Sequence, residues 1–187
     1  MTRRLLRITL IGLVALVAFA AFLPTLSQLT GFKITWSQAA NPTSSGQSET
    51  AECTGNGVTL VIDPGDSAGT TPLIECVKNF NGTGWDLFAA AGAKVEGTSQ
   101  YPVGFVCRID GYPAPTAQTC QNTPSRKQGT WVYFNMAAGG EPIWRFSMQG
   151  AAVRRPECGS VEGWVFSSSE KPLDHPRVTP KPTICDD

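Results

Sequence analysis

The residues that could do chemistry are few in this sequence, and the cysteines come first among them. The chain of 187 residues has six cysteines, one histidine and no Cys-x-x-Cys spacing, so zinc binding or dithiol redox chemistry is a poor fit. An even number of cysteines in an exported chain predicts disulfides. Many pairings are possible from sequence alone, and our hypothesis is the nearest-neighbour scheme. Its pairs are Cys53–Cys76, Cys107–Cys120 and Cys158–Cys185.

Catalytic groups are not arranged in any recognisable pattern. His175 stands beside Asp174 in a proline-rich tail without a nucleophile nearby, which favours an exposed tail pair over a catalytic dyad. Glycoside hydrolysis needs two facing carboxyl groups, and nothing in the sequence singles out two of the acids. The candidates are Asp86, Asp110, Glu141 and Glu162. We therefore predict a protein that is not an enzyme, with a glycan hydrolase as a remote alternative.

Aromatic residues offer a second kind of chemistry, the stacking of flat ligands. Residues 131–136, 144–148 and 161–166 each carry a Trp with another aromatic residue two positions later, and these positions share one face of a strand. A core position is the first expectation for all of them. The alternative is a partly exposed platform that stacks on a flat ring or a sugar. The ligand-binding set in that case is Trp131, Tyr133 and Trp164.

In two of these segments, polar residues predict which side chains face the core and which face the solvent. Arg145 and Ser147 alternate with Trp144, Phe146 and Met148, so the three apolar side chains are expected to face the core. In the last segment Glu162 has the same parity as Trp164. A carboxylate on that face predicts that this end of the strand lies near solvent.

The elements before these segments predict a sheet with a helix. Residues 58–62 and 72–77 favour strands. Between them, Asp63-Pro-Gly-Asp66 is typical of a turn and has too few oxygen ligands in register for a calcium loop.

A helix is expected next, over residues 85–91, capped by Thr83 or Asn81 and ended by Gly92. Residues 104–111 predict a central strand. This order indicates an α+β domain, with a small mixed or antiparallel sheet and one packed helix, stapled by disulfides.

Four segments together resemble a known pattern. They are Gly84-Trp-Asp-Leu-Phe-Ala-Ala-Ala-Gly92, Gly104-Phe-Val-Cys-Arg-Ile-Asp-Gly111, Thr130-Trp-Val-Tyr-Phe-Asn135 and Gly159-Ser-Val-Glu-Gly-Trp-Val-Phe166. Their order resembles the β-grasp-like domain at the C-terminus of transcobalamin and intrinsic factor, and small secreted actinobacterial proteins of unassigned function. The resemblance covers roughly residues 56–168. It implies a β-grasp-like fold and a cell-surface setting, with a corrinoid as a hypothetical ligand, since a fold does not determine function.

The N-terminus predicts export. Arginines at positions 3, 4 and 7 precede an apolar stretch that ends at Pro24, which is typical of a signal peptide or a single membrane anchor. We expect four parts in the chain. They are a signal or anchor over residues 1–40, a flexible polar spacer over 41–52, the domain over 53–168, and a proline-rich tail over 169–187 that Cys185 ties back.

Charge and location limit the function. Residues 1–40 hold four basic and no acidic residues, which leaves 11 basic against 15 acidic residues in the remainder. A net negative domain without a basic run is a poor partner for nucleic acid or for anionic lipid. The expectation is a secreted or anchored surface module that binds a small planar metabolite and supports uptake through a transporter. The alternative is a structural or adhesive domain whose partner is a cell-surface protein.

Overall fold

The computed structural model describes residues 47–49 and 51–186. The fold below is that of the unit that comprises residues 42–187. The predicted signal or anchor lies outside the described residues, as does most of the predicted spacer. Within the described part, no helix has the length and apolar character needed to cross a membrane.

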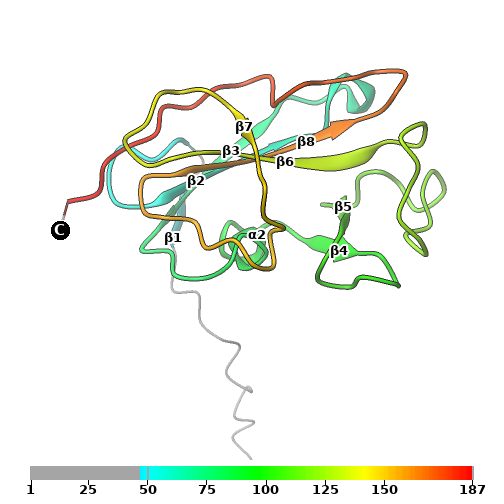
Figure 1. The fold of residues 1–187 in the computed structure, drawn as a ribbon, viewed down its shortest axis with the longest axis horizontal. Helices are drawn as coiled ribbons and strands as arrows, with labels where there is room; N and C mark the ends of the chain where they lie inside the picture. Colours follow the sequence, from blue (N-terminus) through cyan, green and yellow to red (C-terminus); the bar gives the residue numbers. More distant parts are fainter. Residues whose placement is uncertain (1–46, 50, 187) are drawn as a thin grey trace, which may run out of the picture. The chain divides into compact units, whose positions relative to one another are not determined.

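A six-stranded sheet forms the centre of the domain, with the strand order β1-β3-β2-β8-β6-β7 (Figure 1). Strands β2 and β8 are parallel, and all other neighbours are antiparallel. The strands are β1 (Gln47–Glu49), β2 (Val58–Asp63), β3 (Leu73–Lys78), β6 (Thr130–Met136), β7 (Arg145–Phe146) and β8 (Val161–Ser167).

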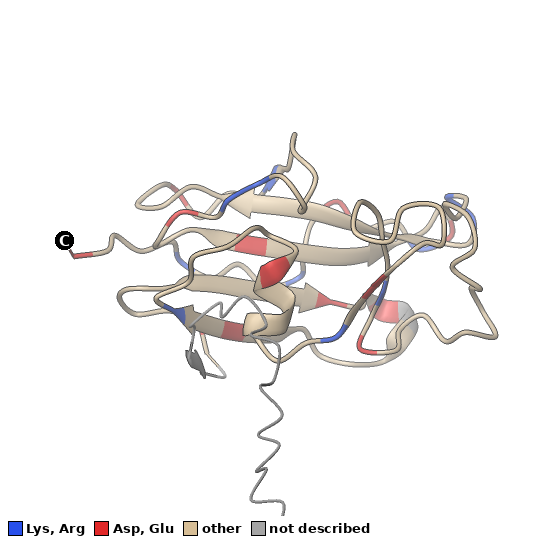
Figure 2. Ribbon diagram, turned by 90° about the horizontal axis from the view of Figure 1, so that it is seen from below, with Lys and Arg blue, Asp and Glu red and all other residues tan. Residues whose placement is uncertain are grey.

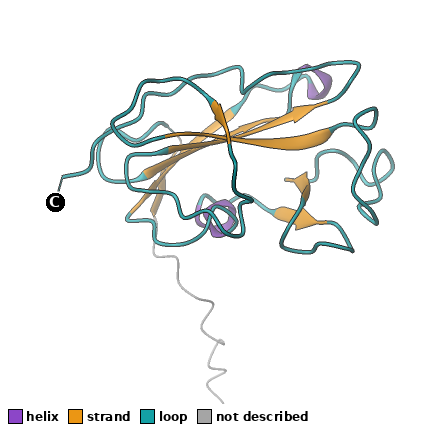
Figure 3. Ribbon diagram, viewed as in Figure 1, coloured by secondary structure: helices purple, strands orange, loops and turns teal. Residues whose placement is uncertain are grey.

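The remaining elements are short, and loops connect them (Figure 3). They are the 3₁₀ helix η1 (Asp66–Ala68), the helix α2 (Asp86–Ala90) and a two-stranded sheet of β4 (Val95–Gly97) and β5 (Val106–Ile109). A mixed sheet with few helices makes this a small α+β domain, as the sequence predicts.

One face of the sheet packs on α2. Alternate side chains of β2 point to this face, where they meet Leu87 and Phe88 of the helix, both fully buried. Large aromatic rings of β6 and β8 complete the same cluster. The cluster includes Val58, Leu60, Ile62, Val77, Leu87, Phe88, Trp131, Tyr133, Trp164 and Phe166.

The opposite face of the sheet is covered by chain that comes late in the sequence. Val61, Met136 and Val161 form a second cluster, on which Trp144 and Val178 pack. A Cβ atom at Gly163 would lie 2.5 Å from the ring of Trp144. Glycine at this position therefore lets the indole approach β8 closely, and both faces of the central strands are buried.

Helix α2 is bounded by the signals that the sequence predicts. Thr83 and Asp86 exchange hydrogen bonds, since the Thr83 backbone N–H donates to the Asp86 carboxylate at 2.8 Å and the Asp86 N–H donates to the Thr83 hydroxyl at 3.3 Å. This is the reciprocal arrangement of a capping box. After the helix, Gly92 adopts φ 77°, the left-handed conformation that ends many helices.

All three predicted disulfides are confirmed. The pairs are Cys53–Cys76, Cys107–Cys120 and Cys158–Cys185. The last pair ties the tail back to the segment before β8, as expected. Three intramolecular disulfides indicate an oxidising, extracellular-type environment.

Charged residues are spread over the strands and loops of the domain (Figure 2). One of them, Arg108 of β5, is buried, and each of its three guanidinium nitrogens has a hydrogen-bond partner. It donates to the carbonyl oxygens of Pro113 at 2.7 Å and Gln118 at 2.6 Å, and it pairs with Glu96. The arginine thereby holds the loop that the Cys107–Cys120 bridge closes.

Two expectations about the arrangement of strands are wrong. Residues 106–109 do not form a central strand, because β5 pairs only with β4 in the separate small sheet. Part of the predicted flexible spacer is ordered, because β1 pairs with β3 along the sheet edge. The open edge of β3 offers backbone donors and acceptors that a polar segment can satisfy as well as an apolar one.

The expected orientation of residues 144–148 is also wrong in part. Trp144 packs on the sheet, but Phe146 is 60% exposed and Met148 is 90% exposed. The regular strand is only two residues long and lies at the edge of the sheet. Alternation of polar and apolar residues predicts burial only where a second layer covers the strand.

Candidate binding site

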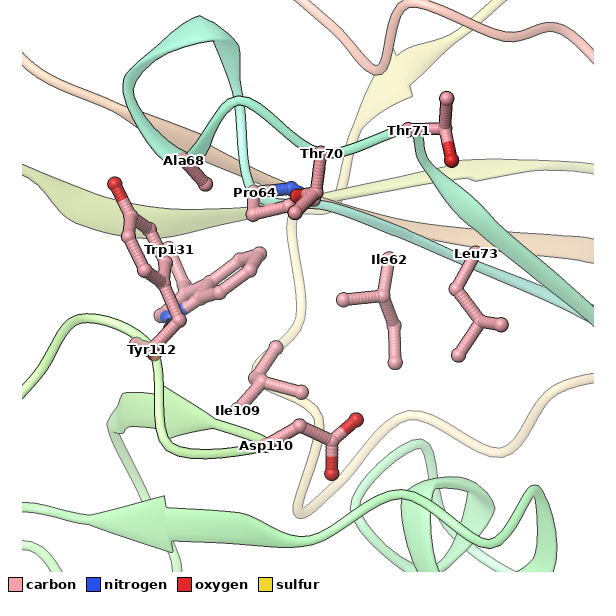
Figure 4. A pocket seen from close by; sticks show the side chains of 10 residues that line it. All are labelled: Ile62, Pro64, Ala68, Thr70, Thr71, Leu73, Ile109, Asp110, Tyr112 and Trp131. Atoms are coloured by element: carbon pink, nitrogen blue, oxygen red, sulfur yellow. Dashed lines mark hydrogen bonds between the residues drawn. The ribbon is translucent and has the colours of Figure 1, made fainter.

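A cavity of about 330 Å³ lies beside the sheet on the face that carries α2. We call it the Trp131 cavity. Its wall combines the turn between β2 and β3, the segment after β5, and β6 (Figure 4). The lining residues are Ile62, Pro64, Ala68, Thr70, Thr71, Leu73, Ile109, Asp110, Tyr112 and Trp131.

A tight hairpin turn positions two of the lining residues. The backbones of Ile109 and Tyr112 exchange hydrogen bonds of 2.9 and 3.0 Å across Asp110 and Gly111. These two central residues have φ of 47° and 80°, as a type I′ turn requires. The Asp110 carboxylate also accepts the Lys94 backbone N–H at 2.7 Å. The turn therefore places the carboxylate at the rim of the cavity and the Tyr112 ring in its wall.

Two aromatic rings meet at a right angle in this wall. The rings of Tyr112 and Trp131 are 6.2 Å apart with an interplanar angle of 85°. The Trp131 indole N–H donates to the Tyr112 carbonyl oxygen at 3.2 Å, so the polar atom of the indole is already satisfied. Phe166 packs edge-on against both rings. The indole position is thus held by packing and by a hydrogen bond before any ligand arrives.

The turn between β2 and β3 forms the opposite wall, and the tail holds it. Asp63 is fully buried and accepts hydrogen bonds from Arg177, the shortest of them 2.7 Å. The same guanidinium donates to Asp66 at 2.7 Å and to the Thr70 carbonyl oxygen at 3.0 Å. Burial raises the pKa of Asp63, but hydrogen bonds from Arg177 and Gly65 outweigh it, so the net pKa lies below its usual value.

The partly exposed aromatic platform is not formed. Trp131, Tyr133 and Trp164 are 5, 6 and 5% exposed, which agrees with the core interpretation. Tyr133 and Trp164 stack on each other with ring centroids 4.4 Å apart. Trp131 is the one of the three that lines the cavity. The reason is that all three side chains point to the face covered by α2 and by the small sheet.

Glu162 is fully buried, so the prediction that its end of β8 lies near solvent is wrong. Its carboxylate accepts two hydrogen bonds of 2.8 Å from Arg154, one of 2.5 Å from the Tyr133 hydroxyl and one of 3.1 Å from Ser160. These four bonds use the full acceptor capacity of the group. Paired and saturated in this way, Glu162 has a structural role and no capacity left for a substrate.

The lining of the Trp131 cavity is mostly apolar and uncharged. Asp110 is the only carboxylate in its lining, whereas glycoside hydrolysis needs two. His175 and Asp174 are exposed in the tail and do not line it. Within the described residues there is no group of three or more His, Cys, Asp or Glu side chains arranged to hold a metal ion.

The sequence predicts a ligand contact at Trp131 and offers Asp110 only as one of several candidate acids, and it does not predict the other lining residues. The one local signal is Asp110-Gly111, a pair typical of two-residue hairpin turns, which sits in the segment assigned to a central strand. At Ile62 and Leu73 the sequence predicts a strand and nothing more. Their place in a cavity depends on which loops pack above them, and no local pattern encodes that.

Comparisons of the chain with known protein families, with curated proteins and with solved structures found no match. The resemblance to the transcobalamin C-terminal domain therefore stays a prediction.

Proposed function

We propose that the domain is an exported or membrane-anchored surface module that binds a small, flat, apolar ligand in the Trp131 cavity. The observation that carries this proposal is a cavity walled by two perpendicular aromatic rings and by aliphatic side chains, chiefly Ile62, Leu73 and Ile109. Ligand sites in proteins are mostly apolar concavities with a few fixed polar groups. Asp110 and the two threonines at the rim supply such groups.

The size of the cavity limits the ligand. Its volume, about 330 Å³, is at the low end of known ligand pockets and fits one flat ring system. A whole corrinoid is much larger than the cavity, so only one peripheral side group of a corrinoid would enter it. The walls are held in place without ligand by the Asp110-Gly111 turn and by Arg177, and such preorganisation lowers the cost of binding.

The cellular setting of the proposal comes from the sequence and the disulfides. An N-terminal signal or anchor and three disulfides fit a domain outside the cytoplasm. A β-grasp-like domain similar to that of transcobalamin would, in this setting, present a metabolite for uptake. A component of a membrane transporter is the corresponding protein partner.

Binding of indole to the oxidised full-length chain tests the proposal. Indole is neutral, flat and apolar, and its few heavy atoms predict a Kd of about 0.5 mM. Ala68 lines the cavity, and its methyl group points toward the aromatic side (Figure 4). We expect Ala68→Phe to fill this space and to raise the Kd for indole at least about tenfold, measured by NMR titration. Ala89→Phe, at an exposed position of α2, is the matched control.

Two results would count against this function. One is the absence of saturable binding by folded chain at millimolar indole. The other is binding that Ala68→Phe and Ala89→Phe leave equally unchanged. Cobalamin in the same titration tests the corrinoid hypothesis separately. If cobalamin binds and Ala68→Phe weakens this binding, the result would support entry of one peripheral side group of the corrinoid into the cavity.

A second candidate function is adhesion to a protein partner. The observation that favours it is the exposed apolar group at the sheet edge near β7, where Ile143, Phe146 and Met148 are 57, 60 and 90% exposed. Edge strands with exposed apolar residues are natural places for strand or surface pairing. Phe146→Ser with Met148→Ser would abolish attachment to cells if this function holds, and Ala68→Phe would leave it intact.

A further inference from the structure

The charge of the Trp131 cavity gives the class of its ligand, provided that the proposed binding function holds. We infer that the ligand is an organic cation, with a protonated amine or N-methylated ammonium group attached to a flat apolar body. The apolar body lies against Ile62 and Trp131, and the cationic group lies at the rim beside Asp110.

The charged residues around the cavity favour a cationic ligand. Asp110 is the only acidic residue in the lining, and the lining contains no lysine or arginine. The nearby Lys94 ammonium lies 3.4 Å from Glu96. Across the part of the chain that the structure describes, no ion pair includes Asp110. The Arg177 guanidinium, which contacts the lining residue Thr70, is already paired with Asp63 and Asp66. A cation therefore finds an unpaired counter-charge at the rim, whereas an anion does not.

The Asp110 carboxylate is held in place by the backbone. Asp110 has φ 47° in the type I′ turn, and one of its carboxylate oxygens accepts the Lys94 backbone N–H. That oxygen is fixed by the backbone, so the position of the charge is determined before binding. A charge that is already ordered costs little side-chain entropy when a ligand pairs with it.

The aromatic wall of the Trp131 cavity also favours a cationic ligand. Trp131 and Tyr112 present two rings at 85°, and a cation near such rings is attracted by their negative faces. The indole N–H is used internally, so it does not compete as a donor. Figure 4 shows Asp110 on one side of the cavity, Thr70 and Thr71 on the other, and Ile62 and Ile109 between them. Polar groups thus lie at the rim around an apolar floor.

Three probes with the same indole ring test the inference on the oxidised full-length chain. They are tryptamine, which is cationic near neutral pH, indole, which is neutral, and indole-3-acetate, which is anionic. We expect tryptamine to bind about fivefold more tightly than indole and the acetate to bind more weakly than indole. Methyl signals of Ile62 and Ile109 in NMR titrations report binding in the cavity itself.

Asp110→Asn is the sharpest variant, because asparagine tolerates positive φ and its amide oxygen can still accept from Lys94. It removes the charge and keeps the turn. We expect Asp110→Asn to abolish the preference, so that tryptamine and indole bind to the variant with equal affinity. Asp174→Asn, in the exposed tail, is the control and should keep the preference.

The outcomes separate this inference from the function on which it rests. Equal affinities for tryptamine and indole, or a preference that survives in Asp110→Asn, would overturn the cationic ligand while indole binding still supports the cavity. Failure of all three probes to bind would overturn both. A preference that weakens at high salt in the native chain would support the role of Asp110.

Discussion

At the scale of single residues, Glu162 shows how a buried charge is tolerated in this domain. Burial, together with the negative charge of Glu162, holds the pKa of the Tyr133 hydroxyl well above its usual value. The hydrogen bonds to Glu162 raise the pKa of Arg154. Both donors therefore keep their protons at neutral pH, and the carboxylate stays paired. Removing one donor would leave part of a buried charge unsatisfied.

Tyr133→Phe tests this network with little change of shape. The substitution keeps the ring that stacks on Trp164 but deletes the hydrogen bond to Glu162. A hydrogen bond to a charged group contributes about 1.5–3 kcal/mol, so we expect the free energy of unfolding to fall by that amount in urea titrations. Tyr101→Phe, at a half-exposed position, is the matched control. Equal small effects of the two substitutions would show that the network is not needed for stability.

At the scale of elements, the C-terminal tail is part of the folded domain. Its backbone pairs with the chain near β8, since the Thr183 N–H donates to the Gly159 carbonyl oxygen at 2.9 Å and the Gly139 N–H donates to the Thr183 carbonyl oxygen at 2.8 Å. Arg177 then links the tail to the turn between β2 and β3 through Asp63. The tail therefore supports one wall of the Trp131 cavity from outside the sheet.

Arg177→Met should reveal the strength of this link. The change leaves the buried Asp63 carboxylate without its cation, and breaking such a pair typically costs about 3–5 kcal/mol. We expect the free energy of unfolding to fall by about 3 kcal/mol, the lower limit of that range, because the Arg177 side chain is 31% exposed. Urea unfolding measures the loss. Arg155→Met, at an exposed position, should change stability by no more than about 0.5 kcal/mol.

The same pair predicts a dependence on pH with a definite sign. The pKa of Asp63 is lower in the folded chain than its usual value of about 3.9. A lowered pKa contributes stability that is complete above the unfolded value and is lost as the pH falls through the folded value. The stability difference between the native chain and Arg177→Met should therefore shrink in acid. A difference that stays constant down to about pH 2 would contradict the ion pair as its cause.

At the scale of the whole molecule, the disulfides compensate for a domain with little helix and many loops. The three bridges span sequence separations of 23, 13 and 27 residues. Loop entropy predicts a contribution of about 3–4 kcal/mol from each. Together these contributions are comparable to the full stability of a typical domain.

Reduction of the disulfides should therefore unfold the domain. We expect near-ultraviolet circular dichroism to lose its native signal at body temperature when excess reductant is present. A chain with only the Cys107→Ala and Cys120→Ala substitutions should stay folded under oxidising conditions, at a cost of about 3 kcal/mol. A reduced chain that unfolds within a few degrees of the oxidised chain would show that the sheet and its core suffice.

The sequence by itself determined most of the local elements, and it left the disulfide pairs as a hypothesis among many possible pairings. The apolar runs of β2, β6 and β8, and the Thr83 and Gly92 signals of α2, depend on neighbours along the chain, so each segment carries its own information. The nearest-neighbour disulfides are confirmed, and they connect cysteines that are consecutive in sequence.

Only the tertiary structure decided which faces of these elements are covered. Phe146 and Trp144 stand two residues apart, yet one is exposed and the other packs on β8, because the sheet ends at β7. The Trp131 cavity joins residues from three separate parts of the chain. Glu162 is buried because Arg154 reaches it from a loop. Long-range packing sets burial, cavities and the pairing of charges, and these properties depend on contacts that no segment contains alone.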